Sequence, residues 1–144
     1  MKEVEQLVYA RLIGDTEPVN GLVALAGGVG NILHAFQSAQ PTVPGVTFHI
    51  YTQLPGQAGG DFVRTTELFI QFNIFAANYD LIAFRLFRLF NAHTFAVPTN
   101  YVQVGQVSCI WDWEGPDGFD EQLEIQRKDV RYRFFVVPKA QNPI

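Results

Sequence analysis

Residues 62–90 read FVRTTELFIQFNIFAANYDLIAFRLFRLF, and this stretch decides the fold. In its first half, apolar residues recur at every second position, which is the periodicity of a β-strand. The opposite side of this strand is only partly polar, and its apolar side holds Phe62, Leu68, Ile70, Phe72 and Ile74. The second half has a helical pattern, and Asn78 can cap that helix. The sequence therefore predicts a long strand that leads directly into a central helix.

The predicted central helix, residues 78–91, is apolar on almost every side. After its first turn, only Arg85 and Arg88 interrupt the apolar run, and because they are three positions apart they form one narrow polar stripe. A helix of this composition must be covered by its own fold or by another subunit. We predict that the two arginines face solvent, a lumen or a charged partner, and that the rest of the helix is buried.

The other segments supply two further helices and several strands in hairpin-like pairs. The spacing predicts an amphipathic helix over residues 3–13 and a short helix over residues 19–25 that ends at a run of glycines. This order favours an α+β fold with a mostly antiparallel sheet, and with the N-terminal and central helices packed mainly on one face. Strands are predicted at residues 31–36, 46–54, 62–75, 101–113 and 121–137, and a loose tail at residues 138–144.

Length and composition exclude several classes of protein. The 144 residues fit one domain, 1–144. The net charge of −4 argues against a protein that wraps nucleic acid, which needs a basic face. Cys109 is the only cysteine, so we expect no intrachain disulfide and a buried, unreactive thiol. No stretch reaches the ~20 apolar residues of a membrane-spanning helix. These features favour an intracellular setting without a membrane partner.

No motif in the chain points to catalysis or to a cofactor. Gly28-Val29-Gly30 lacks the third glycine, the lysine and the preceding strand of nucleotide-binding loops, so a turn is favoured. The three histidines do not have the spacing of metal ligands. No serine or cysteine lies in the strand–turn–helix setting of a nucleophile. We therefore predict a protein that is not an enzyme and needs no metal or cofactor.

Two charged clusters near the C-terminus are the candidate interaction residues. One is acidic, within the segment WDWEGPDGFDEQLE, and the other is a basic stripe that includes Arg131 and Arg133. The two clusters can pair within one chain across neighbouring strands. Alternatively, the basic stripe can meet the acidic cluster of an adjacent subunit, as happens in rings of identical chains. The candidate interface residues are Asp112, Glu114, Asp117, Asp120, Glu121, Arg131, Arg133, Arg85 and Arg88.

The order of these elements resembles that of the tail terminator (tail completion) proteins of long-tailed bacteriophages. The resemblance spans most of the chain and includes no catalytic signature. It rests on an N-terminal helix that ends at Gly14, a small apolar helix with a glycine turn, a central helix that starts at Asn78, and a polar turn between the last two strands. These parts occupy residues 4–13, 22–30, 32–36, 47–53, 64–75, 102–112 and 124–137.

The resemblance implies a structural protein of the virion. Such proteins form rings, typically hexamers, that cap the tail tube, stop its polymerisation and present a surface to the head-side connector or stopper protein. DNA passes through the lumen without specific binding. The expected location is the head-proximal end of the tail, after assembly in the host cytoplasm.

Two other interpretations remain open at the level of the sequence. The protein could be another head–tail connector or neck protein, which would share the same assembly. It could instead be a small α+β ligand-binding or enzymatic domain whose helix closes over an aromatic pocket. The residues that would line that pocket are Trp111, Trp113, Tyr51 and Phe72.

Overall fold

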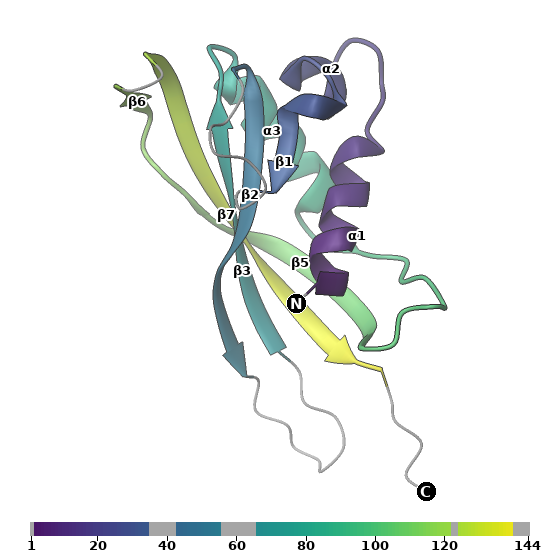
Figure 1. The fold of residues 1–144 in the computed structure, drawn as a ribbon. Coiled ribbons are helices and arrows are strands. Elements are labelled where there is room, and N and C mark those ends of the chain that lie inside the picture. Colours follow the sequence, from purple (N-terminus) through teal and green to yellow (C-terminus); the bar gives the residue numbers. More distant parts are fainter. Residues whose placement is uncertain (1, 35–42, 56–65, 122–123, 140–144) are drawn as a thin grey trace, which may run out of the picture.

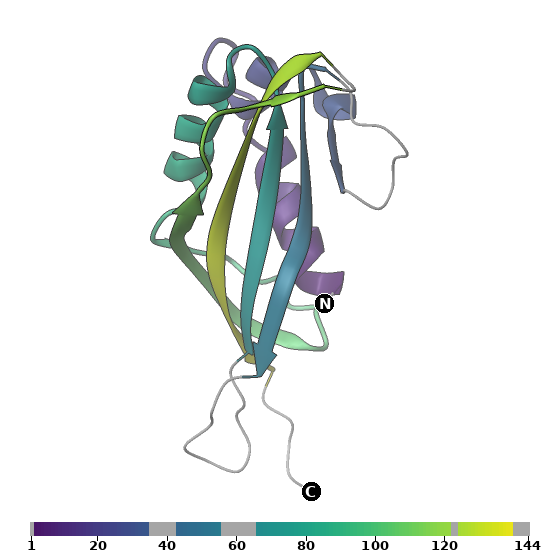
Figure 2. The same ribbon diagram turned by 90° about the vertical axis from the view of Figure 1, so that its left-hand side faces the viewer.

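The computed structural model describes residues 2–34, 43–55, 66–121 and 124–139. These residues form two layers, a long twisted sheet and a layer of helices on one of its faces (Figures 1 and 2). The predicted α+β class, with a mostly antiparallel sheet and an N-terminal helix, is confirmed. The elements are α1 (Lys2–Ile13), α2 (Leu22–Ala26), a 3-10 turn η1 (Val29–Asn31), β1 (Ile32–His34), β2 (Gly45–Pro55), β3 (Thr66–Phe75), α3 (Tyr79–Phe90), β4 (His93–Thr94), β5 (Val104–Glu114), β6 (Gly118–Asp120) and β7 (Ile125–Pro138).

The strands follow the order β1-β2-β3-β7-β5-β4, and β6 pairs with the beginning of β7. β1 runs parallel to β2, and the other pairs are antiparallel. The predicted pairing of β2 with β3 is present, with Val46 opposite Ile74. β7 lies at the centre and pairs with β3 on one side and with β5 on the other.

The core lies between the sheet and the helices. On β3, Leu68, Ile70, Phe72 and Ile74 are fully buried, as their alternation predicts, while Phe62 lies outside the described residues. The ring of Phe72 lies 5.1 Å from that of Phe90 on α3, measured between ring centroids. Among the described residues, no helix is long and apolar enough to cross a membrane. β7 and α1 complete the core with Val130, Tyr132, Phe134, Val136, Val4, Val8 and Leu12.

Several boundaries differ from the prediction, and among them β5 begins at Val104 rather than at residue 101 and β7 at Ile125 rather than at residue 121. α2 begins at Leu22 rather than at residue 19, because the Asp15 carboxylate accepts a hydrogen bond from the backbone N–H of Leu22 at 2.7 Å. The strand predicted at residues 31–36 corresponds to β1, which begins at Ile32. Residues 35–36 lie outside the described residues. At the C-terminus, Pro138 is the last residue of β7, and residues 140–144 of the predicted loose tail lie outside the described residues.

Asn78 occupies the N-cap position of α3, as predicted, but its side chain forms no capping hydrogen bond. Its side-chain amide instead donates to the backbone carbonyl of Leu25 at 3.4 Å, which joins the start of α3 to the end of α2. The backbone carbonyl of Asn78 accepts from the N–H of Ile82, as the first turn of a helix requires.

Two irregularities in β5 change which side its residues face. The sequence predicts Val107, Cys109, Trp111 and Trp113 on one face and Val104 on the other. The register shifts between residues 104 and 106 and again between residues 111 and 113. Each shift inserts an extra residue, so Val104 is buried beside Val107, and the two tryptophans face opposite sides of the sheet.

Candidate interaction surfaces

The outer side of α3 is apolar and exposed, which contradicts the prediction that the helix is buried apart from its arginines. The exposed fractions of Leu81, Phe84 and Phe87 are 58%, 61% and 42%. Ile82 and Leu86, which face the sheet, are fully buried. The reason is geometric, because a helix in a two-layer fold can bury only the side that faces the sheet. No other described part of the chain covers this outer side.

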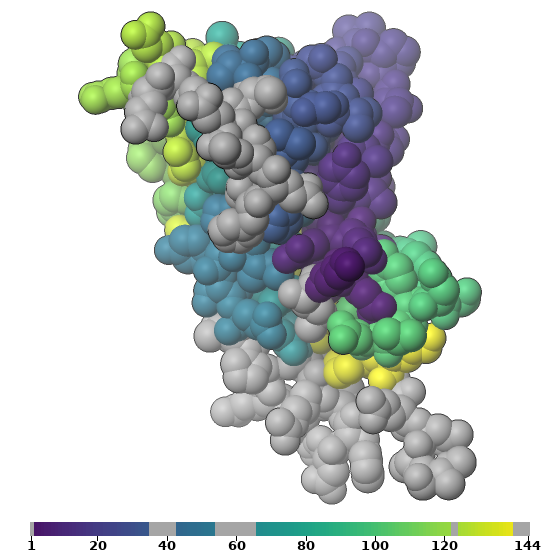
Figure 3. All heavy atoms as spheres, in the orientation of Figure 1, coloured from purple at the N-terminus to yellow at the C-terminus, as the bar shows by residue number. Residues whose placement is uncertain are grey.

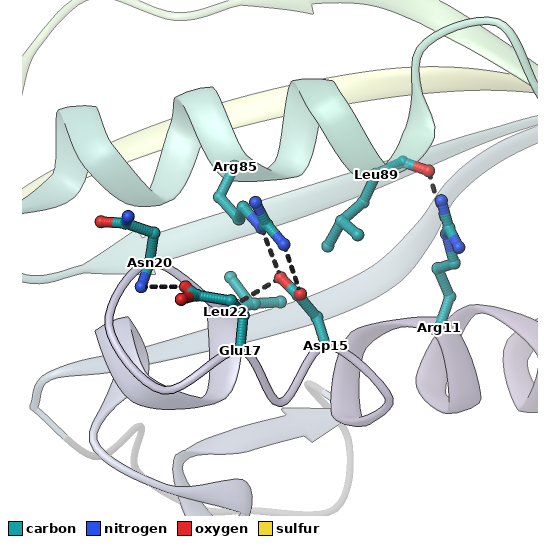
Figure 4. A network of polar contacts seen from close by, with 7 residues as sticks. All are labelled: Arg11, Asp15, Glu17, Asn20, Leu22, Arg85 and Leu89. Atoms are coloured by element: carbon teal, nitrogen blue, oxygen red, sulfur yellow. Dashed lines mark hydrogen bonds and ion pairs between the residues drawn. The ribbon is translucent and has the colours of Figure 1, made fainter.

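Arg85 is not part of an exposed polar stripe, which corrects a second prediction about α3. Its guanidinium donates two hydrogen bonds of 2.6 Å to the carboxylate of Asp15, whose side chain is 7% exposed (Figure 4). The hydrogen bonds from Arg85 hold the pKa of the Asp15 carboxyl below its usual value. The same carboxylate accepts from the N–H of Leu22. Arg85 therefore ties α3 to the connection between α1 and α2.

Arg88 is exposed, as predicted, and its guanidinium carbon lies 5.8 Å from the centroid of the Phe84 ring. Phe84 forms a ridge with a hollow on each side. The first hollow, of about 330 Å³, lies between α2 and α3, and Leu25, Leu81 and Arg88 are among its lining residues. The second, of about 190 Å³, lies between α3 and β5, where Trp111 and Tyr132 contribute to its lining. We call Leu81, Phe84, Phe87 and Trp111 the α3 surface.

The face of the sheet opposite the helices carries the Arg131 site. The guanidinium carbon of Arg131 lies 4.4 Å from the ring centroid of Tyr51 and 4.1 Å from that of Trp113. Trp113 lies on β5, the neighbour of β7, and Tyr51 lies on β2, on the other side of β7 beyond β3. Among the described residues, Arg131 forms no ion pair, and its Nε is buried without a hydrogen-bond acceptor. We call Arg131, Tyr51 and Trp113 the Arg131 site.

Arg133 has a partner within the chain and so differs from Arg131. Its guanidinium forms an ion pair of 2.8 Å with Glu67 on the neighbouring strand β3. The guanidinium carbon also lies 5.0 Å from the ring centroid of Phe135. The two arginines share one face of β7, as their spacing predicts, but only the charge of Arg131 is left without a carboxylate among the described residues.

Three of the six acids in the acidic cluster are paired with β7 of the same chain. Lys128, whose side chain is 10% exposed, lies 2.8 Å from Asp117 and 3.2 Å from Glu114. The hydrogen bond between Lys128 and Asp117 raises the pKa of Lys128 and lowers the pKa of Asp117. Asp120 lies 3.8 Å from Arg127. For these three acids, the structure contains the intrachain pairing that the sequence left as one of two alternatives.

Three acidic residues in this region have no such partner. Asp112, Glu121 and Glu124 form no ion pair or hydrogen bond among the described residues. Phe119, on the short strand β6, is 61% exposed beside them. We call Phe119, Glu121 and Glu124 the β6 tip, and it forms a corner of the molecule, drawn in lime in Figure 3.

The aromatic pocket of the ligand-binding interpretation does not form. Phe72 is fully buried in the core, and Trp111 lines the hollow beside α3. Trp113 and Tyr51 lie on the opposite face of the sheet with Arg131. Because the four side chains point to both sides of the sheet, they cannot surround one ligand.

Cys109 is buried, as predicted, and its thiol lies 2.6 Å from the backbone carbonyl of Phe90. Burial raises the pKa of this thiol to about 12, so it carries no reactive thiolate near neutral pH. Within the described ranges, no group of three or more histidine, cysteine, aspartate or glutamate side chains is placed to hold a metal ion.

No protein-family model matches the chain, and no curated protein sequence matches it.

Proposed function

We propose that the protein is a ring-forming tail terminator of a long-tailed bacteriophage. It caps the tail tube, stops its polymerisation and offers a surface to the head-side connector, while DNA passes through the lumen. The observation that carries this proposal is the exposure of large aromatic side chains on the outer sides of both layers. Phe84 is 61% exposed on the helix side, and Tyr51 is 54% exposed on the sheet side.

Exposed aromatic side chains on two opposite sides favour a protein with several partners. Contiguous exposed apolar surface in a small domain marks a contact site. A domain with one partner needs one such surface, whereas this chain has the α3 surface and the Arg131 site on opposite faces of its sheet. A tail terminator must contact its ring neighbours, the tail tube protein and the connector, so more than one surface is expected of it.

The order of elements and the charge of the chain also support this function. The order of elements that underlies the resemblance is present in the described residues, from α1 through β3 and α3 to β7. Each chain has a net charge of −4, so a ring of several chains is strongly acidic. Acidic walls repel phosphates and let DNA slide rather than bind. The ring number of six, the absence of enzymatic activity and the location in the virion tail are part of the same proposal.

Light scattering and electron microscopy test the function. The purified protein, alone or mixed with tail tubes, is expected to have the mass of a closed ring, and a stable monomer under both conditions would contradict the proposal. Tails assembled without this protein are expected to be uneven in length and unable to join heads. Tails of normal length that fail to join heads would favour another neck protein, and normal tails that join heads would exclude both functions.

A further inference from the structure

We propose that the Arg131 site of one subunit binds a carboxylate of the β6 tip of the neighbouring subunit, Glu121 or Glu124. This inference rests on the ring proposed above and names the contact between its subunits. It assigns Arg131, rather than Arg133, as the basic partner, and it leaves the α3 surface for a different protein.

The geometry of Arg131 favours a carboxylate ligand. Aromatic rings from β2 and β5 lie within 4.4 Å of its guanidinium carbon and fix the orientation of the group. Its N–H donors lie in the plane of the guanidinium, so they can donate two parallel hydrogen bonds to the two oxygens of a carboxylate. The Nε atoms of both Arg131 and Arg133 are buried without an acceptor among the described residues. The guanidinium of Arg133 has Glu67 as its counterion, whereas that of Arg131 has no carboxylate in the described part of the chain, so its terminal N–H groups are the donors that a ligand would meet.

The β6 tip has the matching chemistry. Glu114, Asp117 and Asp120 form ion pairs with Lys128 or Arg127, whereas the side chains of Glu121 and Glu124, like that of Asp112, form none among the described residues. The exposed ring of Phe119 lies next to them in the chain and can pack against the aromatic rings around Arg131.

The tip cannot reach the Arg131 site of its own chain. β6 pairs with β7 at Arg127 and runs from there toward Ile125, away from Arg131. Four residues of strand separate Arg127 from Arg131, which is about 13 Å. The tip lies at one end of the sheet, where β6 pairs with the beginning of β7 (Figures 1 and 2). Arg131 lies with Tyr51 and Trp113 on the face opposite the helices. A contact between two such different regions is heterologous, and repeated heterologous contacts give a ring when the rotation between neighbouring subunits closes.

Charge reversal tests the contact. Arg131→Glu is expected to weaken ring assembly at least tenfold, because it places like charges opposite each other. Lys2→Glu, an equal change of charge at an exposed position on α1, is the matched control and is expected to assemble as the wild type does. Combining Arg131→Glu with Glu121→Lys and Glu124→Lys is expected to restore assembly. Circular dichroism and thermal melting establish that each variant is folded.

Disulfide trapping tests the same contact without removing Arg131. Gln71, opposite Arg131 on β3, and Glu121 are replaced by cysteine, and the buried Cys109 does not compete. The double variant is expected to give a ladder of linked subunits after oxidation, and a mixture of the two single variants is expected to give only dimers. Each single variant alone is expected to stay unlinked.

The outcomes separate this inference from the proposed function. Normal rings of Arg131→Glu, or no linked species from the double cysteine variant within intact rings, would overturn the assigned contact and leave the ring in place. Linked dimers of one single variant alone would also overturn it, since they indicate a contact between identical sites. A wild-type protein that stays monomeric alone and on tail tubes would refute the ring itself.

Discussion

At the scale of single residues, Asp15 joins three helices through one carboxylate. It accepts two hydrogen bonds from Arg85 on α3 and one from the N–H of Leu22 at the start of α2, directly after the end of α1 (Figure 4). Nearby, Arg11 on α1 donates from Nε to the carbonyl of Leu89 at 3.0 Å. The helix layer is therefore held together by polar contacts as well as by the apolar core. These partners lie far apart in the sequence, so periodicity alone did not identify them.

Replacing Asp15 by asparagine is expected to lower the free energy of unfolding by about 2–4 kcal/mol, because it leaves a partly buried guanidinium without its counterion. Urea denaturation measures the change. The matched control is Glu17→Gln, whose carboxylate accepts a hydrogen bond only from the exposed N–H of Asn20, and a loss under about 1 kcal/mol is expected there. Equal losses in the two variants would show that the pair with Arg85 contributes little.

The ion pair between Asp15 and Arg85 predicts that the free energy of unfolding depends on pH. The folded-state pKa of Asp15 is lower than the ordinary value of 3.8. Its stabilising contribution is therefore fully present above that ordinary value, and it is lost as the pH falls through the lower folded-state pKa. The difference in unfolding free energy between the wild type and Asp15→Asn should shrink in this acidic range. A difference that stays constant down to the lowest pH at which both proteins fold would contradict this assignment.

At the scale of elements, β3 and α3 were predictable in position and β5 was not predictable in detail. The strict alternation from Leu68 to Ile74 identifies the buried side of β3, and the core contains those residues. In β5, one extra residue at each irregularity moves all later side chains to the other face, and no local pattern marks where that happens. Alternation therefore placed Trp111 and Trp113 together, although they are on opposite sides.

The error on α3 has a different cause. Its apolar composition was interpreted as burial, but composition does not distinguish cover by the same chain from cover by a partner. Arg85 was expected to face solvent, a lumen or a charged partner, and its partner Asp15 could not be named because it is distant in the sequence. The charged candidate residues were chosen from the sequence, while their pairing within the chain depended on the tertiary structure.

Replacing Phe84 by serine is expected to distinguish contacts between subunits of the ring from contacts with tail tubes or the connector. Phe84 is 61% exposed, so its loss should change the unfolding free energy by about 1 kcal/mol or less. Ring mass should stay unchanged, and affinity for tail tubes or the connector should fall at least tenfold, as it does for a central aromatic contact. Co-sedimentation with tubes measures the affinity. Val19→Ser, in the connection before α2 at a site that is 71% exposed, is the control. Loss of the ring in Phe84→Ser would place α3 between the subunits.

At the scale of the whole molecule, the two layers divide the surface into sides of different chemistry. The helix side presents the apolar α3 surface, with Arg88 beside it. The open sheet side presents arginines next to aromatic rings, and the β6 tip presents carboxylates at one end. A chain built in this way can contact an identical chain through charge and a different protein through apolar area.

This division predicts how salt acts on the assembly. A contact between Arg131 and a partly exposed carboxylate is screened, so raising NaCl from about 50 mM to about 500 mM should shift rings toward monomers severalfold. Light scattering on diluted samples measures the shift. Binding of rings to tail tubes through the α3 surface should change little, or strengthen, over the same range. A ring mass independent of salt at every dilution would mean that apolar contacts alone hold the subunits together.

The irregularity between Trp111 and Trp113 gives the protein an optical label on each of its two sides. The chain has only these two tryptophans, and one lies beside α3 while the other lies beside Arg131. In a Trp111→Phe variant, indole emission comes from the open sheet face alone, and in Trp113→Phe it comes from the helix side alone. The proposed subunit association and the proposed capping of tail tubes can then be followed separately in the same protein, without attaching a dye to either surface.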